Sequence, residues 1–317
     1  MEARSPGQNV STEAPSTSVS RIDGPDHAAT VPGRRRPPVA ASLLVAPLVI
    51  ILVAVFVSAI LVLGEFSFHR FSDGLTQPGY TLTEWSTFLT DPYVWSLTRE
   101  TVILGLITTG VCAVIGYATG LALHHSNSPR WRAVCYFAIF SPLLTSVVAR
   151  TYGWSLILGD AGFLNALATP MHLPGAPYAL LYQRPAVVIA LVHILLPFMV
   201  MPVISSLGQI DSQLPAAAAD LGASAWTTLR KVLFPLSLPG LIAGCQLTFA
   251  LTISAFATPS LLGGGRVQVL ATNTYSDVQN LNWPRAGVGS FLLLALALLS
   301  LAAFAAVQRG LVSWRRR

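Results

Sequence analysis

The sequence predicts an all-α polytopic membrane protein with six transmembrane helices, and two observations support this fold class. Of its 317 residues, 53% are hydrophobic and only 10% are charged, with a mean hydropathy of +0.62. An ordinary soluble domain contains about 25% charged residues. In addition, six stretches without Asp, Glu, Lys or Arg reach, or nearly reach, the length of about 20 apolar residues that crosses a bilayer core. Both observations argue against a soluble protein.

The charge-free stretches place the helices in order. We expect helices near 41–63, 99–123, 133–156, 185–206, 238–258 and 286–307. The third charge-free stretch is short, so its helix should continue through Arg150 towards Leu158. After the fifth helix, three consecutive glycines, Gly263 to Gly265, predict that residues 258–268 form a loop.

A seventh charge-free stretch, 161–183, contains three prolines, two glycines and an asparagine. This composition is typical of an ordered extramembrane loop, here with one short helix.

The distribution of charge predicts the orientation. An even number of helices puts both termini on one side. That side then carries 13 basic and 6 acidic residues, and the other side carries 6 basic and 7 acidic residues. Because Lys and Arg concentrate in cytoplasmic loops, both termini should be cytoplasmic. The basic balance therefore reflects membrane topology and gives no reason to expect a nucleic-acid partner.

Composition also divides the chain into segments. Residues 1–38 are rich in Ser, Pro, Gly and Thr, which predicts a disordered cytoplasmic tail. Residues 39–310 form the transmembrane domain, and 311–317 form a basic cytoplasmic tail. The first apolar stretch is too long for a signal peptide and lacks a clear cleavage site after it, so it should remain as a membrane anchor.

The longest predicted cytoplasmic connection, about 207–236, has the sequence pattern of a helical hairpin. Asp211 or Ser212 can cap a first helix that contains four consecutive alanines. Gly222 provides the left-handed residue that ends this helix. Ser224 can then cap a second short helix.

The second helix of this loop has one apolar stripe. Trp226, Leu229 and Leu233 are spaced i, i+3 and i+7, and Pro235 and Pro239 should close the helix before the fifth span. From the residues alone, two interpretations remain open. The hairpin is either an amphipathic linker on the lipid surface or a docking element for a partner.

The motif in this loop carries a family resemblance. Its first part is Ala217, Ala218, Ala219, Asp220, Leu221, Gly222 and Ala223, and its second part runs from Leu233 through Pro235 and Pro239 to Gly240. This pattern resembles the EAA loop of permease subunits in binding-protein-dependent ABC importers. Four further segments resemble the spermidine/putrescine permease branch: Arg150–Trp154, Ile194–Met199, Leu261–Gly265 and Asn282–Pro284. The resemblance covers about residues 40–310.

The resemblance implies the architecture of a type I ABC importer permease in the bacterial inner membrane. It implies two ATPase subunits, a second permease subunit that is a homologous different chain, and a periplasmic or lipid-anchored binding protein. The cargo would be a small solute of the polyamine type or a related one. The EAA loop would form a coupling helix that docks in a groove of the ATPase, and the stripe with Trp226 and Leu229 would hold this loop against the helix bundle. Where the family motif usually has a glutamate, this chain has Ala216.

The absence of several motifs also favours a permease subunit without its own ATP-binding site. A P-loop requires a lysine after its glycines, and the only lysine is Lys231, which follows Arg230. ATP would therefore be bound by a partner, and we expect no cofactor in this chain. An ion-coupled secondary transporter is the alternative function. No Asp or Glu occupies the centre of a predicted span, which disfavours that alternative. A membrane-embedded enzyme comes third, since no catalytic motif is present.

Four residues are candidates for the translocation path: Arg150, Tyr152, Trp154 and His193. For Arg150, a structural ion pair with Glu100 is the competing interpretation, because charges inside membranes tend to pair. For His193, a hydrogen-bonded core histidine is the competing interpretation.

Metal binding and disulfide formation are not expected. Cys112, Cys135 and Cys245 lie in apolar stretches without the spacing of a metal site and should be buried thiols. His124 and His125 end the second helix without a nearby Cys or carboxylate in the sequence.

Overall fold

The computed structural model describes residues 39–72, 74–171, 174 and 176–315. The chain divides into two units, residues 1–55 and 56–317. In the first unit, the structure describes only the beginning of helix α1 (Val39–Ser67). The disorder predicted for residues 1–38 lies outside the described residues.

Five helices in the described part of the chain are long and apolar enough to cross a membrane. Four of them are α1, α3 (Pro92–His125), α7 (Arg184–Gly208) and α13 (Trp283–Arg315). The fifth is α10 (Phe234–Ile253) together with the helical turns before it. The predicted all-helical membrane fold is confirmed, and α3 and α13 extend several residues beyond their predicted ends.

The third predicted span is not one straight helix. It consists of α4 (Pro129–Phe140), the 3₁₀ turn η1 (Ser141–Leu144) and α5 (Val147–Leu158), with a bend of 107° between the two helical parts. The expectation of a continuous helix over 133–156 was wrong. Pro142 removes an amide donor from the α-helical pattern, and the chain continues past it only as the 3₁₀ turn. Thr145 and Ser146 then have ψ values of 148° and 136°, outside helical geometry, and separate the two helical parts. With this bent pair counted as one span, the structure has six spans.

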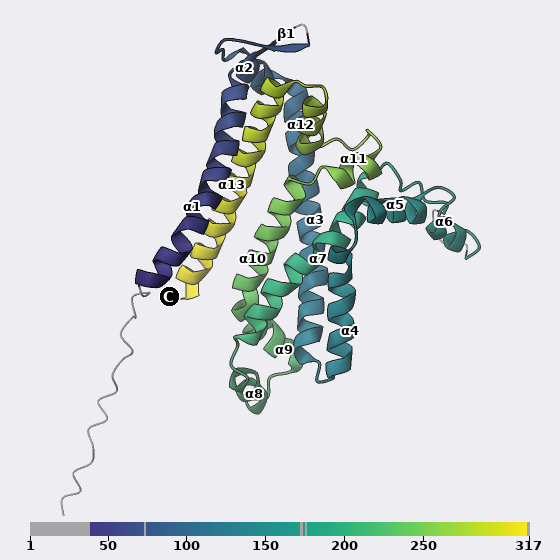
Figure 1. Ribbon diagram of the computed structural model, residues 1–317. Coiled ribbons are helices and arrows are strands. Elements are labelled where there is room, and N and C mark those ends of the chain that lie inside the picture. Colours follow the sequence, from purple (N-terminus) through teal and green to yellow (C-terminus); the bar gives the residue numbers. More distant parts are fainter. Residues whose placement is uncertain (1–38, 73, 172–173, 175, 316–317) are drawn as a thin grey trace, which may run out of the picture. The chain divides into compact units, whose positions relative to one another are not determined.

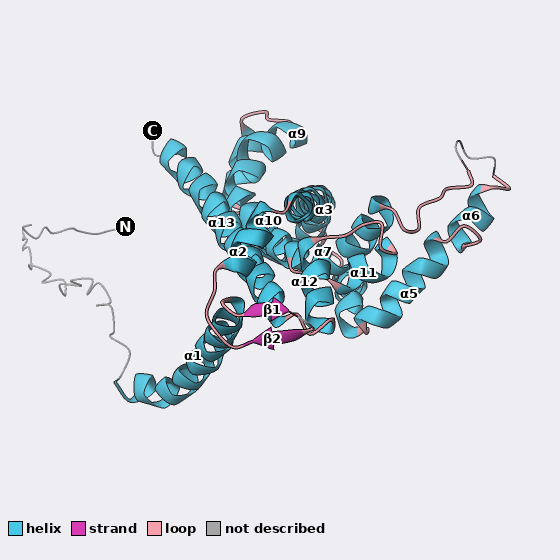
Figure 2. Cartoon of the chain, turned by 90° about the horizontal axis from the view of Figure 1, so that it is seen from above, coloured by secondary structure: helices cyan, strands magenta, loops and turns pink. Residues whose placement is uncertain are grey.

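The helices α3, α7 and α10 contact one another and form the centre of the 56–317 unit (Figure 1). In the view from above, α3 is seen end-on beside α7 and α10 (Figure 2). Small residues permit this contact, because a Cβ built at any of four glycines on α3 or α10 would crowd atoms of α7. Each helix carries two of these glycines at a spacing of four, the pattern typical of close helix packing in membranes. They are Gly116, Gly120, Gly240 and Gly244.

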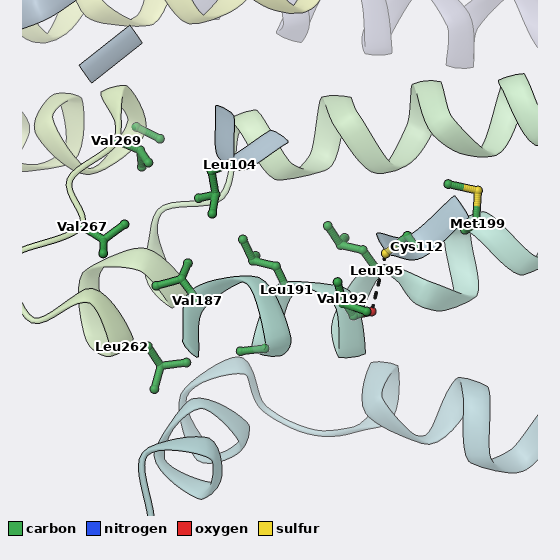
Figure 3. Close-up of a cluster of buried hydrophobic side chains, with 12 residues drawn as sticks. Leu104, Cys112, Val187, Leu191, Val192, Leu195, Met199, Leu262, Val267 and Val269 are labelled. Atoms are coloured by element: carbon green, nitrogen blue, oxygen red, sulfur yellow. Dashed lines mark hydrogen bonds between the residues drawn. The ribbon is translucent and has the colours of Figure 1, made fainter. Parts of the chain in front are cut away.

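A buried apolar cluster fills the space around α7 (Figure 3). Cys112 of α3 is part of it, and its thiol lies 3.9 Å from the carbonyl oxygen of Val192, a weak hydrogen bond. Cys112 is buried as predicted, whereas Cys135 and Cys245 are only partly buried. All three are free thiols.

Short elements cover the end of the unit opposite to the 207–236 loop (Figure 1). The strands β1 (Arg70–Ser72) and β2 (Leu75–Gln77) pair antiparallel, with Phe71 opposite Thr76. Helix α2 (Thr83–Thr90) follows them, and α12 (Leu270–Gln279) packs beside α13.

Two predicted loops contain short helices. The loop predicted over 161–183 includes α6 (Phe163–Ala168), which confirms the expected short helix. The loop predicted over 258–268 was wrong in its first half, because α11 (Ala257–Gly263) forms there. The glycines do end a helix, as expected, but that helix is α11: Gly264 adopts φ +52° and terminates it.

Candidate functional site

The loop between α7 and α10 forms the predicted helical hairpin. Its first helix, α8, spans Gln213–Asp220. Of the two predicted N-terminal caps, Asp211 makes the bond: its Oδ1 accepts from the backbone N–H of Gln213 at 2.9 Å. Ser212 occupies the cap position but makes no capping bond with its side chain.

Gly222 makes the turn that reverses the chain. It has φ +82°, a conformation that glycine adopts without steric cost. The amide of Ala223 donates to the carbonyl of Ala218 at 3.0 Å, and the amide of Gly222 donates to the carbonyl of Ala219 at 2.9 Å. These two bonds define a Schellman motif, which satisfies the last carbonyls of α8. The predicted role of Gly222 as a helix terminator is thus confirmed.

The second helix of the hairpin continues directly into the membrane span. It begins at α9 (Ala225–Thr228), where the Ser224 hydroxyl accepts from the Thr227 amide at 3.3 Å. A π-helical turn, η2 (Leu229–Leu233), leads into α10 without interruption. The prediction that Pro235 and Pro239 end this helix was wrong. Both prolines lie inside this continuous helix, Pro235 two residues after the π-helical turn, and the helix passes through both.

The apolar stripe of this helix is buried at one end only. Leu233 is buried and Leu229 is half-buried, but Trp226 is 70% exposed. At the tip, Leu221 is 89% exposed and Leu214 is 47% exposed. An apolar surface of this kind on a loop is typical of an interaction site.

A groove of about 500 Å³ lies between this hairpin and the end of α3. Leu121 and His125 line it from α3, and Ala219, Ala223 and Trp226 line it from the hairpin. By contrast, Gly240 is buried in the bundle against α7. The structure therefore divides the motif into an exposed tip and a buried base.

Three of the four path candidates meet in one pocket. Arg150, Trp154 and His193 line a pocket of about 540 Å³ at the bend between α4 and α5. Tyr152 does not line it. The side chain of Tyr152 is 61% exposed and borders a separate pocket of about 190 Å³ beside Tyr182.

Arg150 does not pair with Glu100, so that prediction was wrong. Its guanidinium Nη1 donates to the carbonyl of Pro142, the residue that breaks the helix. Glu100 instead forms an ion pair with Arg184, with 2.6 Å between Oε1 and Nη2. Arg184 begins α7, and both α3 and α7 have their N-terminal parts at this end of the bundle, which brings the two side chains together.

His193 makes the predicted hydrogen bond but is not a core residue. Trp154 Nε1 donates to His193 Nδ1 at 3.3 Å, and the two rings meet edge to face with centroids 5.5 Å apart. The His193 side chain is exposed in this chain. The bond orients the ring, and its Nε2 atom takes no part in it.

Another set of residues comes together that could not be grouped from sequence alone. A pocket of about 780 Å³ at the end opposite to the hairpin is lined by Glu100, Arg184, Arg266, Tyr93 and Gln268. These residues share a position at or near the N-terminal ends of α3, α7 and α12. That these three helix ends lie together becomes apparent only from the arrangement of the helices in space.

No metal centre is found within the described ranges, where His, Cys, Asp and Glu never gather in groups of three or more that could hold an ion.

Comparisons with known proteins agree with this geometry. Residues 130–317 match the family of binding-protein-dependent transport system inner membrane components. The spermidine/putrescine transport system permease protein PotB of Escherichia coli K12 is 33% identical over 234 residues, which are 73% of this chain and 83% of that protein. PotC of the same strain, also a spermidine/putrescine transport system permease protein, is 24% identical over 253 residues, 79% and 87% of the two chains.

A solved structure has the same fold. A chain of a bacterial ABC transporter that imports alginate superposes with a TM-score of 0.71 at 15% identity, and the match covers 86% of this chain and 96% of that one. The family match covers more than half of the sequence, and the similarities to these relatives and to this fold agree with it. The chain belongs to the family of binding-protein-dependent transport system inner membrane components and is the permease subunit of an ABC importer, a transporter component rather than an enzyme.

Proposed function

We propose that this permease subunit pairs with a second, homologous permease chain and provides part of a path for a polyamine-type cation. An external binding protein would deliver the cargo, and two ATPase subunits would drive transport from the cytoplasmic side. The PotB and PotC relatives, two different permeases of one strain, support both the cargo class and a partner that is a different chain.

The observation that carries this proposal is the hairpin at 207–236. Its tip exposes Leu214 and Leu221, and its second helix is continuous with α10 up to Ile253. A force on the tip would therefore reach a membrane span through the hydrogen-bonded turn at Gly222 and the continuous helix that follows it. In this proposal the tip docks against an ATPase, and Arg230 and Lys231 flank the contact on the cytoplasmic side.

The orientation and the segments follow from the same proposal. The hairpin and both termini would be cytoplasmic, residues 39–310 would form the membrane domain, and 311–317 would begin a basic tail. The positive-inside distribution of Lys and Arg supports this orientation.

The Gly222→Asp variant tests the role of the hairpin. An L-residue in the left-handed conformation costs about 1–2 kcal/mol, and the new carboxylate lies on the proposed docking tip. We expect ATP-driven uptake to fall at least tenfold in proteoliposomes that contain the complete importer, with normal amounts of protein in the membrane.

Gly74 offers a matched control for this variant. It has φ +77°, close to the +82° of Gly222, and a Cβ at either position would meet no atom within 4 Å. Gly74→Asp therefore introduces the same strain and charge away from the hairpin, and uptake should remain close to that of the wild type. Normal uptake by Gly222→Asp would contradict the docking assignment.

The cargo is tested separately. Calorimetric titration of the cognate binding protein with spermidine, putrescine and uncharged sugars should show tight binding of a polyamine alone. Tight binding of a sugar or an anion would overturn the cargo part of the proposal and leave the permease assignment intact.

A further inference from the structure

The pocket at the α4–α5 bend contains a cation, Arg150, that has no counter-ion among the described residues. Among the described residues, Arg150 takes part in no salt bridge, and its Nε atom is buried without a hydrogen-bond partner. Its one bond is the donation from Nη1 to the carbonyl of Pro142. The pocket walls otherwise consist largely of apolar groups, with Trp154 and His193 as the other large polar side chains.

Helix lengths place this pocket far from both ends of the spans. Helix α4 has 12 residues before Ser141, which lines the pocket, and this corresponds to about 18 Å at about 1.5 Å per residue. A bilayer core is about 30 Å thick. His193 follows the first residue of α7, Arg184, by nine positions, which corresponds to about 14 Å from the other side. Both measures put the pocket inside the hydrocarbon layer.

At this depth an isolated guanidinium is unfavourable, and intramembrane charges pair or line water-filled cavities. Lipid phosphates lie at the membrane surfaces, too far away to act as the partner. The cargo is also an unsuitable partner, because a polyamine-type cation would be repelled by Arg150. Among these sources of a counter-ion, another polypeptide is the one that fits both the depth and the charge of the site.

The surface around the pocket is suited to such a polypeptide. Residues of η1 and α5 next to it are strongly exposed in this chain: Leu144 is 81% exposed, Leu156 is 74% exposed and Val148 is 52% exposed. An apolar rim around a single half-buried charge is the pattern of an interface that desolvates an ion pair at its centre.

We propose that an acidic side chain of the second permease subunit enters this pocket and forms an ion pair with Arg150. The inference rests on the proposed pairing with a second permease. Trp154 and His193 would form the walls of the site, and the carboxylate would accept hydrogen bonds from the guanidinium, including one from the orphan Nε atom. The pair would neutralise Arg150 beside the path of a cationic cargo.

A crosslinking experiment locates the partner. The photoreactive amino acid p-benzoylphenylalanine replaces Ile157, which lines the pocket, in the complete importer reconstituted in nanodiscs. Leu298 of α13, which is 56% exposed, serves as the control position. We expect Ile157 to crosslink to a segment of the second permease that contains an Asp or a Glu. Crosslinks to lipid alone, or to a segment without an acid, would overturn the proposal.

Charge reversal then tests the pair. Arg150→Glu should reduce uptake at least tenfold, and reversal of the crosslinked acid to Arg in the second permease should restore at least a third of wild-type uptake. Arg150→Lys keeps the charge but lacks the guanidinium Nε–H, so it should retain more uptake than Arg150→Glu and less than the wild type. Native gel electrophoresis shows whether each complex assembles. If no reversal rescues an assembled complex, the proposal fails. Wild-type uptake in the same vesicles remains dependent on ATP and the binding protein in either case, so the proposed function is tested independently.

Discussion

Gly240 of α10 lies directly against the carbonyl oxygen of Pro202 in α7, so closely that a Cβ at Gly240 would overlap this oxygen and the Cβ of Ser206. Both contacts involve the backbone or its first side-chain atom, which cannot move aside by rotation. Because Gly240 is also the last residue of the coupling motif, the base of the hairpin is fixed to the bundle at this point.

The first prediction concerns this contact. Gly240→Ala should lower the free energy of unfolding by about 1–3 kcal/mol, the usual cost of overpacking a well-packed core. The apparent melting temperature of the purified complex measures the effect. Gly208→Ala is the control, since a Cβ there meets no atom within 4 Å. Equal melting temperatures for the two variants would contradict the close approach.

Much of the fold could be predicted from charge and length. Stretches without charged residues identified all six spans, because a charge inside the bilayer is costly whatever the tertiary structure is. The bend at Pro142 was not predicted. The stretch from 133 to 158 is apolar on both sides of this proline, and hydropathy does not distinguish a straight span from a broken one.

The candidate site was predictable to a lesser extent. The Schellman turn at Gly222 depends on local chemistry, so the sequence predicted it correctly. The partner of Glu100 depends on which helix ends lie side by side. The sequence favoured Arg150 only because the two residues were expected at a similar depth in the membrane. In the structure Arg184 is nearer, because α3 and α7 are in contact along their lengths.

The second prediction concerns the Glu100–Arg184 pair. The Arg184 side chain is 54% exposed and that of Glu100 is 28% exposed, and such pairs contribute about 0–1 kcal/mol. Glu100→Gln and Arg184→Gln should each change the apparent melting temperature no more than Arg99→Gln, a substitution of an exposed neighbour without a salt bridge in the described part of the chain. A loss of several degrees in the first two variants alone would indicate that the pair is structurally important.

The third prediction concerns the motif position that departs from the family. Ala216 is an exposed residue of α8, and Glu has nearly the same helix propensity as Ala. Ala216→Glu should therefore leave the melting temperature unchanged to within about 0.5 kcal/mol of stability. If docking rests on shape and apolar contact, ATPase activity stimulated by the loaded binding protein should change less than twofold. Leu221→Glu, at the 89% exposed tip, should abolish this stimulation. A large effect of Ala216→Glu together with none of Leu221→Glu would reverse this assignment.

The last prediction concerns Asp277 of α12, which links this helix to Arg285 of α13 at the end opposite to the hairpin. Its Oδ2 atom lies 3.8 Å from Arg285 Nε and accepts a hydrogen bond from Asn273 at 3.0 Å. Arg285 also pairs with Asp91 at 3.2 Å and lies over the ring of Phe88.

Burial raises the pKa of Asp277 from 3.8 to about 6. Arg285 opposes this shift and Glu84 adds to it. Because the folded protein holds this proton more tightly than the unfolded chain does, the contribution of Asp277 to stability is most favourable below pH 3.8. It decreases as the pH rises to about 6, by at most about 3 kcal/mol at about 1.4 kcal/mol per pKa unit. Other carboxylates have their own pH dependence, so the comparison with Asp277→Asn isolates this residue. In thermal melts of the complex, the stability of Asp277→Asn minus that of the wild type should be larger at pH 7.5 than at pH 5. Parallel curves for the two proteins would show that Asp277 is ionised throughout this range. Arg285→Gln should raise the pKa of Asp277 further, because it removes the charge that favours the carboxylate. The pH at which stability falls should therefore be higher in that variant than in the wild type.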